Sequence, residues 1–224
     1  LPAKFTVQLL TKRLYNLKHK KLINLIEPPI MQKRNSKVEF GYIAKFFHWF
    51  SAFAITLLLV LGFFMSDIPK ASLWHAIAKN LHQLFGIAFL ITTLIRIIWA
   101  AVNIQPQIPG KPSKFERMAA KFGHISLYVL MLALPLSGWL ITSAKGVAKK
   151  LPTIGNYHLA IPGISKNINL SKNVHLIHEI LAWVIIIFIV LHIAAALKHH
   201  YINKNFVLRR MLPNRNNKMI IKKL

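Results

Sequence analysis

Five histidines lie within long apolar stretches of the sequence, where an ionisable side chain is costly and usually serves a function. They are His48, His82, His124, His178 and His192. The last two stand 14 residues apart, which in an α-helix is about 21 Å of rise and about 40° short of four full turns. Their imidazoles therefore lie on one face of one helix at two depths.

The same interval of 14 residues recurs in the three preceding apolar stretches, where each histidine is followed by glycine or arginine. The partners in chain order are Gly62 after His48, Arg96 after His82, and Gly138 after His124. A glycine on the inward face leaves room for a flat macrocycle, and an arginine can neutralise a buried carboxylate. Two stacked haem groups would require this combination of residues.

The elements that must position these residues are four apolar stretches of about 20 residues, enough for a helix to cross the hydrocarbon of a bilayer. The predicted spans are residues 43–65, 81–102, 119–142 and 175–198. Because lipid cannot satisfy backbone polar groups, we expect an all-α membrane protein, an up-and-down bundle of four transmembrane helices. A chain that is 54% hydrophobic and 16% charged is neither an ordinary soluble domain nor a disordered basic tail.

Basic residues are distributed unevenly between the two sides of this bundle. Lys and Arg number 22 on the side that holds both termini, which includes the span ends there, against 7 in the other two connections. The positive-inside rule then predicts that both termini are cytoplasmic. The formal charge of +25 is interpreted as membrane topology and contact with lipid, and no nucleic-acid partner is expected.

On this orientation, His82 and His178 form an outer level, and His192 pairs at an inner level with either His48 or His124. Neutral imidazole is a good iron ligand. The chain has no cysteine, which excludes disulfides, iron–sulfur clusters and thiolate ligands. Bis-histidine b-type haem is therefore the simplest iron site, and we expect two haem b groups per chain.

The two ends of the sequence differ from the apolar part. Residues 1–30 are basic and lack an apolar run, and Met31 would make a natural start. We interpret this segment as an extended start or a disordered extension; the alternative is an arm on anionic lipid. The predicted four-helix domain is 31–213, and 214–224 is a basic tail.

Several local motifs within residues 31–213 are distinctive. They are Ala44-Lys45-Phe46-Phe47-His48-Trp49, the stretch from Leu81-His82 to Arg96, Gly123-His124 through Leu134-Pro135-Leu136-Ser137-Gly138, His178-Glu179, and Leu191-His192 through His199-His200-Tyr201. In order and spacing they resemble the prokaryotic cytochrome b561 family, four-helix diheme cytochromes that include the membrane superoxide oxidase. Membership would place the chain in a bacterial inner membrane.

The resemblance implies a ligand set that spacing alone leaves open. The inner haem iron would be held by His48 and His192, and the outer haem iron by His82 and His178. Around the two cofactors would lie Arg96, Gly62, Gly138 and His124, the last as a neighbour of the inner haem and the alternative to His48 as its ligand. No catalytic residue beyond the ligands is expected.

The resemblance also implies an activity. Superoxide from the periplasm would reduce the outer haem, the electron would pass to the inner haem, and ubiquinone would be reduced near the end of the last span. The expected quinone-binding residues are His199, His200 and Tyr201. The third connection carries lysines whose field would attract a small anion, namely Lys145, Lys149, Lys150, Lys166 and Lys172.

Other interpretations stay open at this point. The same scaffold could be a membrane-anchor cytochrome that passes electrons between a partner dehydrogenase or hydrogenase and the quinone pool. A transporter without haem would show no Soret absorbance. A zinc site at His175 and His178 would lack a third ligand. The short chain, the basic outer loop and the ending of the last span favour the stand-alone oxidoreductase.

Overall fold

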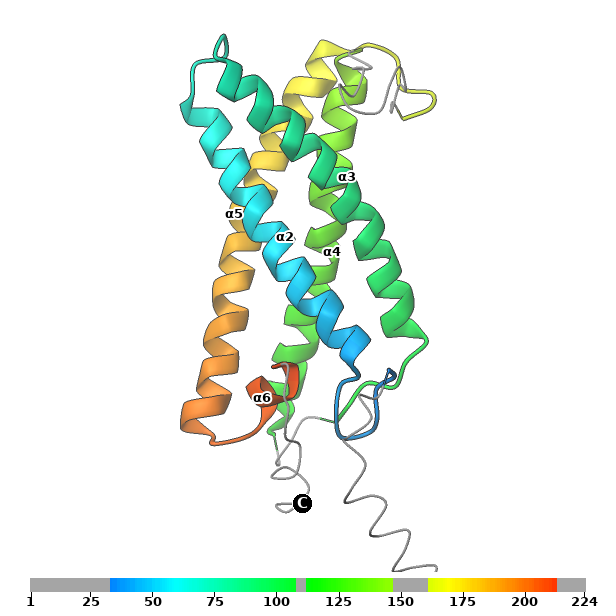
Figure 1. The fold of residues 1–224 in the computed structure, drawn as a ribbon, viewed down its shortest axis with the longest axis vertical. Helices are drawn as coiled ribbons and strands as arrows, with labels where there is room; N and C mark the ends of the chain where they lie inside the picture. Colours follow the sequence, from blue (N-terminus) through cyan, green and yellow to red (C-terminus); the bar gives the residue numbers. More distant parts are fainter. Residues whose placement is uncertain (1–32, 108–111, 147–160, 213–224) are drawn as a thin grey trace, which may run out of the picture. The chain divides into compact units, whose positions relative to one another are not determined.

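The computed structural model describes residues 33–107, 112–146 and 161–212. The regular elements among these residues are all helices, with no strand. The helices in chain order are α2 (Tyr42–Asp67), α3 (Leu73–Ala101), α4 (Lys114–Ala144), α5 (Ile168–Leu197), the π-helical turn η1 (Lys198–Ile202) and α6 (Val207–Met211) (Figure 1). In the described part of the chain, four helices are long and apolar enough to cross a membrane. The predicted all-α membrane bundle is thereby confirmed, while the interpretations of 1–30 and 214–224 lie outside the described residues.

Two helices begin well before the spans predicted from hydropathy. Helix α3 starts eight residues ahead of position 81, and α5 starts seven ahead of position 175. Each start is set by an N-cap: Ser72 accepts a hydrogen bond from the Trp74 N–H, and Asn167 accepts one from the Leu170 N–H. An apolar window detects only the part of a helix that lies in hydrocarbon, whereas polar caps determine where the helix begins.

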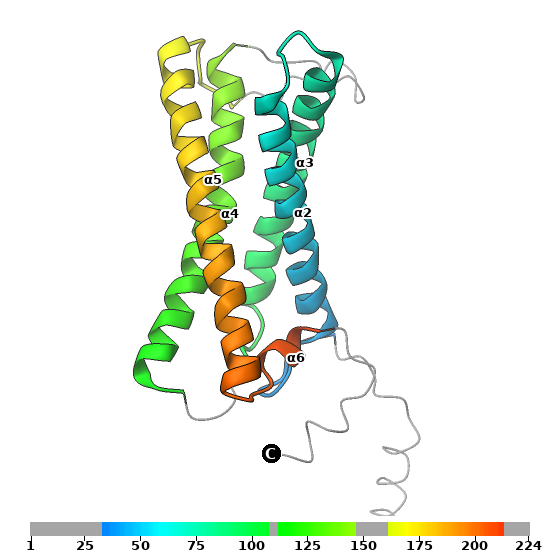
Figure 2. The ribbon, with the colours of Figure 1, turned by 90° about the vertical axis from the view of Figure 1, so that its left-hand side faces the viewer.

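The four long helices run alternately in opposite directions and pack as two pairs. Figure 2 shows α2 beside α3 and α4 beside α5, and α3 also packs against α4. We call the end of the bundle that carries α6 the inner end, and the end that carries residues 68–72 the outer end. At the outer end the Asn167 N–H donates to the Ala144 carbonyl at 2.8 Å, and the Ser171 hydroxyl donates to the Ile141 carbonyl at 3.3 Å. These bonds join the end of α4 to the start of α5.

The buried core forms an apolar layer across the middle of the bundle. Its central members are Ile55, Phe89, Met131 and Ile185, one from each long helix, and Leu130 belongs to the same cluster. Each of the four lies midway between the two positions singled out in its own helix, seven residues from either one. Seven residues are about 20° short of two turns, so this mid-bundle layer separates the outer level from the inner one.

Helix α6 closes the inner end against α2. The Trp49 indole N–H donates to the Met211 carbonyl at 2.7 Å. Arg210 is buried and donates to the Gln107 carbonyl at 2.5 Å. Burial lowers the pKa of the Arg210 guanidinium, and the Glu39 carboxylate opposes that shift. These contacts fix the segment that follows η1.

Candidate functional site

The outer level brings together two histidines from helices that are far apart in the sequence. His82 on α3 and His178 on α5 have ring centres 6.3 Å apart, with the ring planes at 74°. Two imidazoles that bind one metal ion from opposite sides, with metal–nitrogen bonds of about 2 Å, have ring centres roughly 6 Å apart. The outer pair has this spacing.

At the inner level, His192 on α5 has two histidine neighbours. Its ring centre is 6.2 Å from that of His48 on α2 and 5.5 Å from that of His124 on α4. The side chain of His124 is exposed, whereas those of His48 and His192 are half-buried. Of the two ring distances, the one between His48 and His192 is closer to the 6.3 Å of the outer pair.

Two glycines lie against the outer histidines. A Cβ atom added at Gly62 would lie 3.5 Å from Cε1 of His82, and one added at Gly138 would lie 3.4 Å from Cε1 of His178. Nδ1 of His82 is buried without a hydrogen bond of good geometry, although the Leu58 carbonyl is close enough to interact with it. The glycines keep side-chain atoms away from both rings, as a flat group held between them requires.

Arg96 lies at the inner level, and none of the acidic residues that the structure describes is paired with it. Its Nη1 donates to the Phe47 carbonyl at 3.3 Å, its Nη2 is 3.5 Å from Nδ1 of His48, and its guanidinium lies over the Tyr128 ring. A salt bridge elsewhere at the inner end joins Lys198 to Glu116 at 3.3 Å. The charge of Arg96 is thus free to pair with a carboxylate from a bound group, such as a haem propionate.

The donor set suits haem better than a bare metal ion. In the described ranges, no group of three or more His, Cys, Asp or Glu side chains is arranged to hold a metal ion. Haem iron takes four equatorial ligands from the porphyrin and needs two from the protein. A pair of histidines at each level, with glycine and arginine beside them, fits that requirement.

Ser137 is a contact of the outer level that spacing did not single out. Its Oγ lies 2.8 Å from Nδ1 of His178 and 2.8 Å from the Leu134 carbonyl oxygen. The residue directly precedes Gly138, so its depth in the bundle could have been derived from the sequence. Its contact with an imidazole depends on the rotation of α4 against α5, which the sequence does not reveal.

The three residues expected to bind quinone lie within the π-helical turn η1 at the inner end. His199 and His200 are half-buried, and Tyr201 is 70% exposed. Nδ1 of His199 lies 3.1 Å from the side-chain nitrogens of Asn203 and Asn205. Single turns of π-helix occur often at functional sites, and sequence periodicity does not predict them.

Three of the five expected lysines lie in the described part of the third connection and the start of α5. Lys145 follows α4, Lys166 packs beside Gly146, and Lys172 lies in α5; all three are exposed. The joint between α4 and α5 places them at the outer end. The other two, Lys149 and Lys150, lie outside the described residues.

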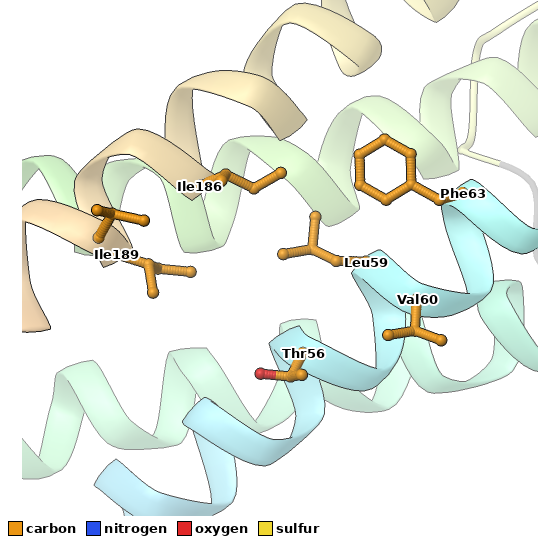
Figure 3. A pocket seen from close by; sticks show the side chains of 7 residues that line it. Thr56, Leu59, Val60, Phe63, Ile186 and Ile189 are labelled. Carbon is orange, nitrogen blue, oxygen red and sulfur yellow. The ribbon is translucent and has the colours of Figure 1, made fainter.

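A pocket of about 450 Å³ lies between α2 and α5, away from these residues (Figure 3). Its lining is Thr56, Leu59, Val60, Phe63, Ile186, Ile189 and Val190. The single hydroxyl donates to a carbonyl of its own helix, so the lining offers no group for acid–base or metal chemistry. In a bilayer such a surface would meet acyl chains.

Comparisons with known proteins identify the family of this chain. The family model for prokaryotic cytochrome b561 matches residues 39–214. Cytochrome b561 homolog 2 of Escherichia coli (strain K12) is 32% identical over 183 residues, 81% of this chain and 95% of its own length. Cytochrome b561 homolog 1 of the same strain is 29% identical over 170 residues, covering 76% and 94%. The Probable superoxide oxidase CybB of Yersinia pestis is 28% identical over 190 residues, covering 83% and 99%.

The matches span nearly the whole of the relatives, and the family model includes all four long helices with the five histidines. The resemblance seen in the sequence motifs is therefore confirmed. The chain belongs to the prokaryotic cytochrome b561 family, integral membrane proteins that bind b-type haem and transfer electrons.

Proposed function

We propose that this protein is a diheme cytochrome that oxidises superoxide at its outer end and reduces ubiquinone at its inner end. Two superoxide ions give two molecules of oxygen and two electrons, which with two protons convert ubiquinone to ubiquinol. The observation that carries the proposal is that two histidine pairs lie at two depths along α5, with ring centres 6.3 Å apart in one pair and 6.2 Å apart in the other. Similarity to a Probable superoxide oxidase supports the choice of donor.

In this proposal His82 and His178 hold the outer haem, and His48 and His192 hold the inner one. When bound, each haem supplies an iron that accepts and releases one electron at a time. The chain supplies the imidazoles, the glycine surfaces beside the outer rings and a cation at the inner level. His124 is assigned as a neighbour of the inner haem, because its ring is 5.5 Å from that of His192 and its side chain is exposed.

The lysines at the outer end would raise the encounter rate with superoxide. Lys145, Lys166 and Lys172 are exposed at the end where α5 begins, and His178 follows further along the same helix. A one-signed field of this kind attracts a small anion, and dissolved salt weakens it. On the positive-inside rule this end faces the periplasm and both ends of the chain face the cytoplasm of a bacterial inner membrane.

The inner end offers a hydrogen-bond donor for a quinone carbonyl. The Asn205 Oδ1 accepts from the Val207 N–H, which turns the Asn205 Nδ2 toward Nδ1 of His199. Since Asn205 donates there, Nδ1 accepts and the imidazole proton is on Nε2. His199 can then donate Nε2–H to a quinone oxygen that becomes basic as it is reduced. His200 and Tyr201 lie beside it in the same turn.

Stopped-flow mixing of the purified, haem-loaded protein with superoxide tests the proposal. We expect haem reduction that is faster than spontaneous dismutation, followed by reoxidation when ubiquinone is added. If superoxide does not reduce the haem in this time, the protein is not a superoxide oxidase, and the anchor-cytochrome interpretation replaces the proposal. A preparation from haem-replete cells without a Soret band would exclude both.

A charge-matched pair of variants tests the lysine field. Changing Lys145, Lys166 and Lys172 together to Gln should slow haem reduction several-fold at about 10 mM salt and much less at 1 M, where the Debye length is about 3 Å. The control changes Lys37, Lys114 and Lys121, three exposed lysines of the inner end. It removes the same charge from the other side of the bundle and should leave the rate unchanged.

A further inference from the structure

The protonation of the His178 ring is determined by its neighbours on α4. The Ser137 Oγ lies 2.8 Å from both the Leu134 carbonyl oxygen and Nδ1 of His178. A hydroxyl has one proton, and a carbonyl oxygen can only accept. Ser137 therefore donates to Leu134 and accepts from Nδ1–H of His178. The lone pair of this imidazole is then on Nε2, the nitrogen that remains for a metal ion.

The inner level is built differently. Nδ1 of His48 faces the Arg96 guanidinium at 3.5 Å, and a guanidinium has no acceptor atom. Of the four proposed ligands in the described part of the chain, His178 is the one whose Nδ1 meets a hydroxyl. The serine thus makes the two levels chemically unequal.

We infer that Ser137 is a positioning residue for the outer haem, and that its hydrogen bond lowers the midpoint potential of that haem. The inference rests on the proposed pairing of His178 with His82. By accepting a hydrogen bond from Nδ1–H, Ser137 makes the imidazole a more basic ligand. A more electron-donating ligand stabilises ferric iron over ferrous iron. A lower outer potential makes electron transfer toward the inner level more favourable, which is the proposed direction.

The test is a redox titration of purified, haem-loaded variants, followed by optical absorbance and low-temperature EPR. Replacing Ser137 by Ala removes only the hydroxyl. We expect both haems to remain and the outer one to become easier to reduce, by up to about tenfold in the ratio of ferrous to ferric iron at a fixed potential. For one electron, a tenfold change corresponds to about 59 mV. The Ser137→Thr variant retains a hydroxyl and should restore the wild-type potential.

A matched control is available on the same helix. The Thr142 hydroxyl donates to the Trp139 carbonyl of its own helix at 2.8 Å, so Thr142→Val deletes a similar bond that does not involve a ring. Its two potentials should equal those of the wild type. An unchanged outer potential in Ser137→Ala, or an equal shift in Thr142→Val, would overturn the inference. Loss of the outer haem alone in Ser137→Ala, with both haems kept in Ser137→Thr, would support the positioning role.

The His82→Ala variant shows which potential belongs to which haem, because it should retain only the inner haem. If His82→Ala and His178→Ala both retain two haems, the ligand assignment within the proposed function is wrong. If those variants behave as expected and Ser137→Ala leaves the outer potential unchanged, only the present inference fails. Superoxide is not used in these titrations, so they also stand apart from the choice of electron donor.

Discussion

Gly138 lies against the ring of His178, and enlarging it should weaken binding of the outer haem. A Cβ at this position would lie 3.4 Å from Cε1 of the imidazole, which is ordinary van der Waals contact, so Gly138→Ala should be tolerated. Leucine adds three more carbons, and each carbon–carbon bond is about 1.5 Å long. Those atoms would compete for the space beside the ring.

The size of the effect follows from the cost of overpacking. Extra methylene groups in a packed site cost about 1–3 kcal/mol. If the haem-bound state bears this cost, the affinity for the outer haem falls about 5- to 150-fold, because 1.4 kcal/mol is a factor of ten. The inner haem, on the far side of the mid-bundle layer, should keep its affinity.

The assay combines the pyridine haemochrome stoichiometry of Gly138→Leu with the rate at which haem is transferred to excess apomyoglobin. We expect one rapidly lost haem and one retained haem. Gly123→Leu is the control, because Gly123 is on the same helix and a Cβ there would meet nothing within 4 Å. Two retained haems with wild-type transfer rates in Gly138→Leu would refute the reasoning, as would equal loss in Gly123→Leu.

Three further substitutions test other parts of the site. His124→Ala should keep two haems per chain by pyridine haemochrome; loss of one would make this residue the inner ligand. Trp49→Phe removes the hydrogen bond to the Met211 carbonyl and should destabilise the inner end by about 1 kcal/mol. This loss should appear as a lower Tm in detergent, and an unchanged Tm would show that the bond contributes nothing. Asn205→Ala removes one of the two amides that face Nδ1 of His199 and should raise the KM for ubiquinone several-fold, while the rate of haem reduction by superoxide stays the same; an unaltered KM would remove Asn205 from the quinone site.

Much of this molecule could be predicted from the sequence because helix geometry is regular. The interval of 14 residues between His178 and His192 places both on one face of α5, and each of them meets a histidine of another helix at its own depth. The same regularity explains why Gly62 and Gly138 both meet outer-level rings. Four long apolar stretches gave the four spans, since hydropathy measures the property that a bilayer selects.

The remaining features depend on how helices rotate and pack against each other. His48 and His124 lie at the same depth, so periodicity cannot separate them, whereas in the folded bundle their rings lie at different distances from His192. The contact of Ser137 with His178 and that of Asn205 with His199 join positions on different helices or across the π-helical turn. Such contacts are set by side-chain direction within the folded bundle, which is not encoded in local spacing.

The mid-bundle layer of Ile55, Phe89, Met131 and Ile185 is a barrier to ions but not to electrons. It has no polar side chain, and an ion that entered it would lose its hydration shell at a large cost, whereas an electron can tunnel through. The two histidine levels are about 21 Å apart along the helix axis, roughly two-thirds of the hydrocarbon thickness. Moving an electron over this distance toward the negative side of the membrane therefore costs about 1.6 kcal/mol for each 100 mV of membrane potential. Turnover should therefore be slower across a membrane that holds a potential than in vesicles whose potential an ionophore has collapsed. The layer would thus link the reaction rate to the respiratory state of the membrane.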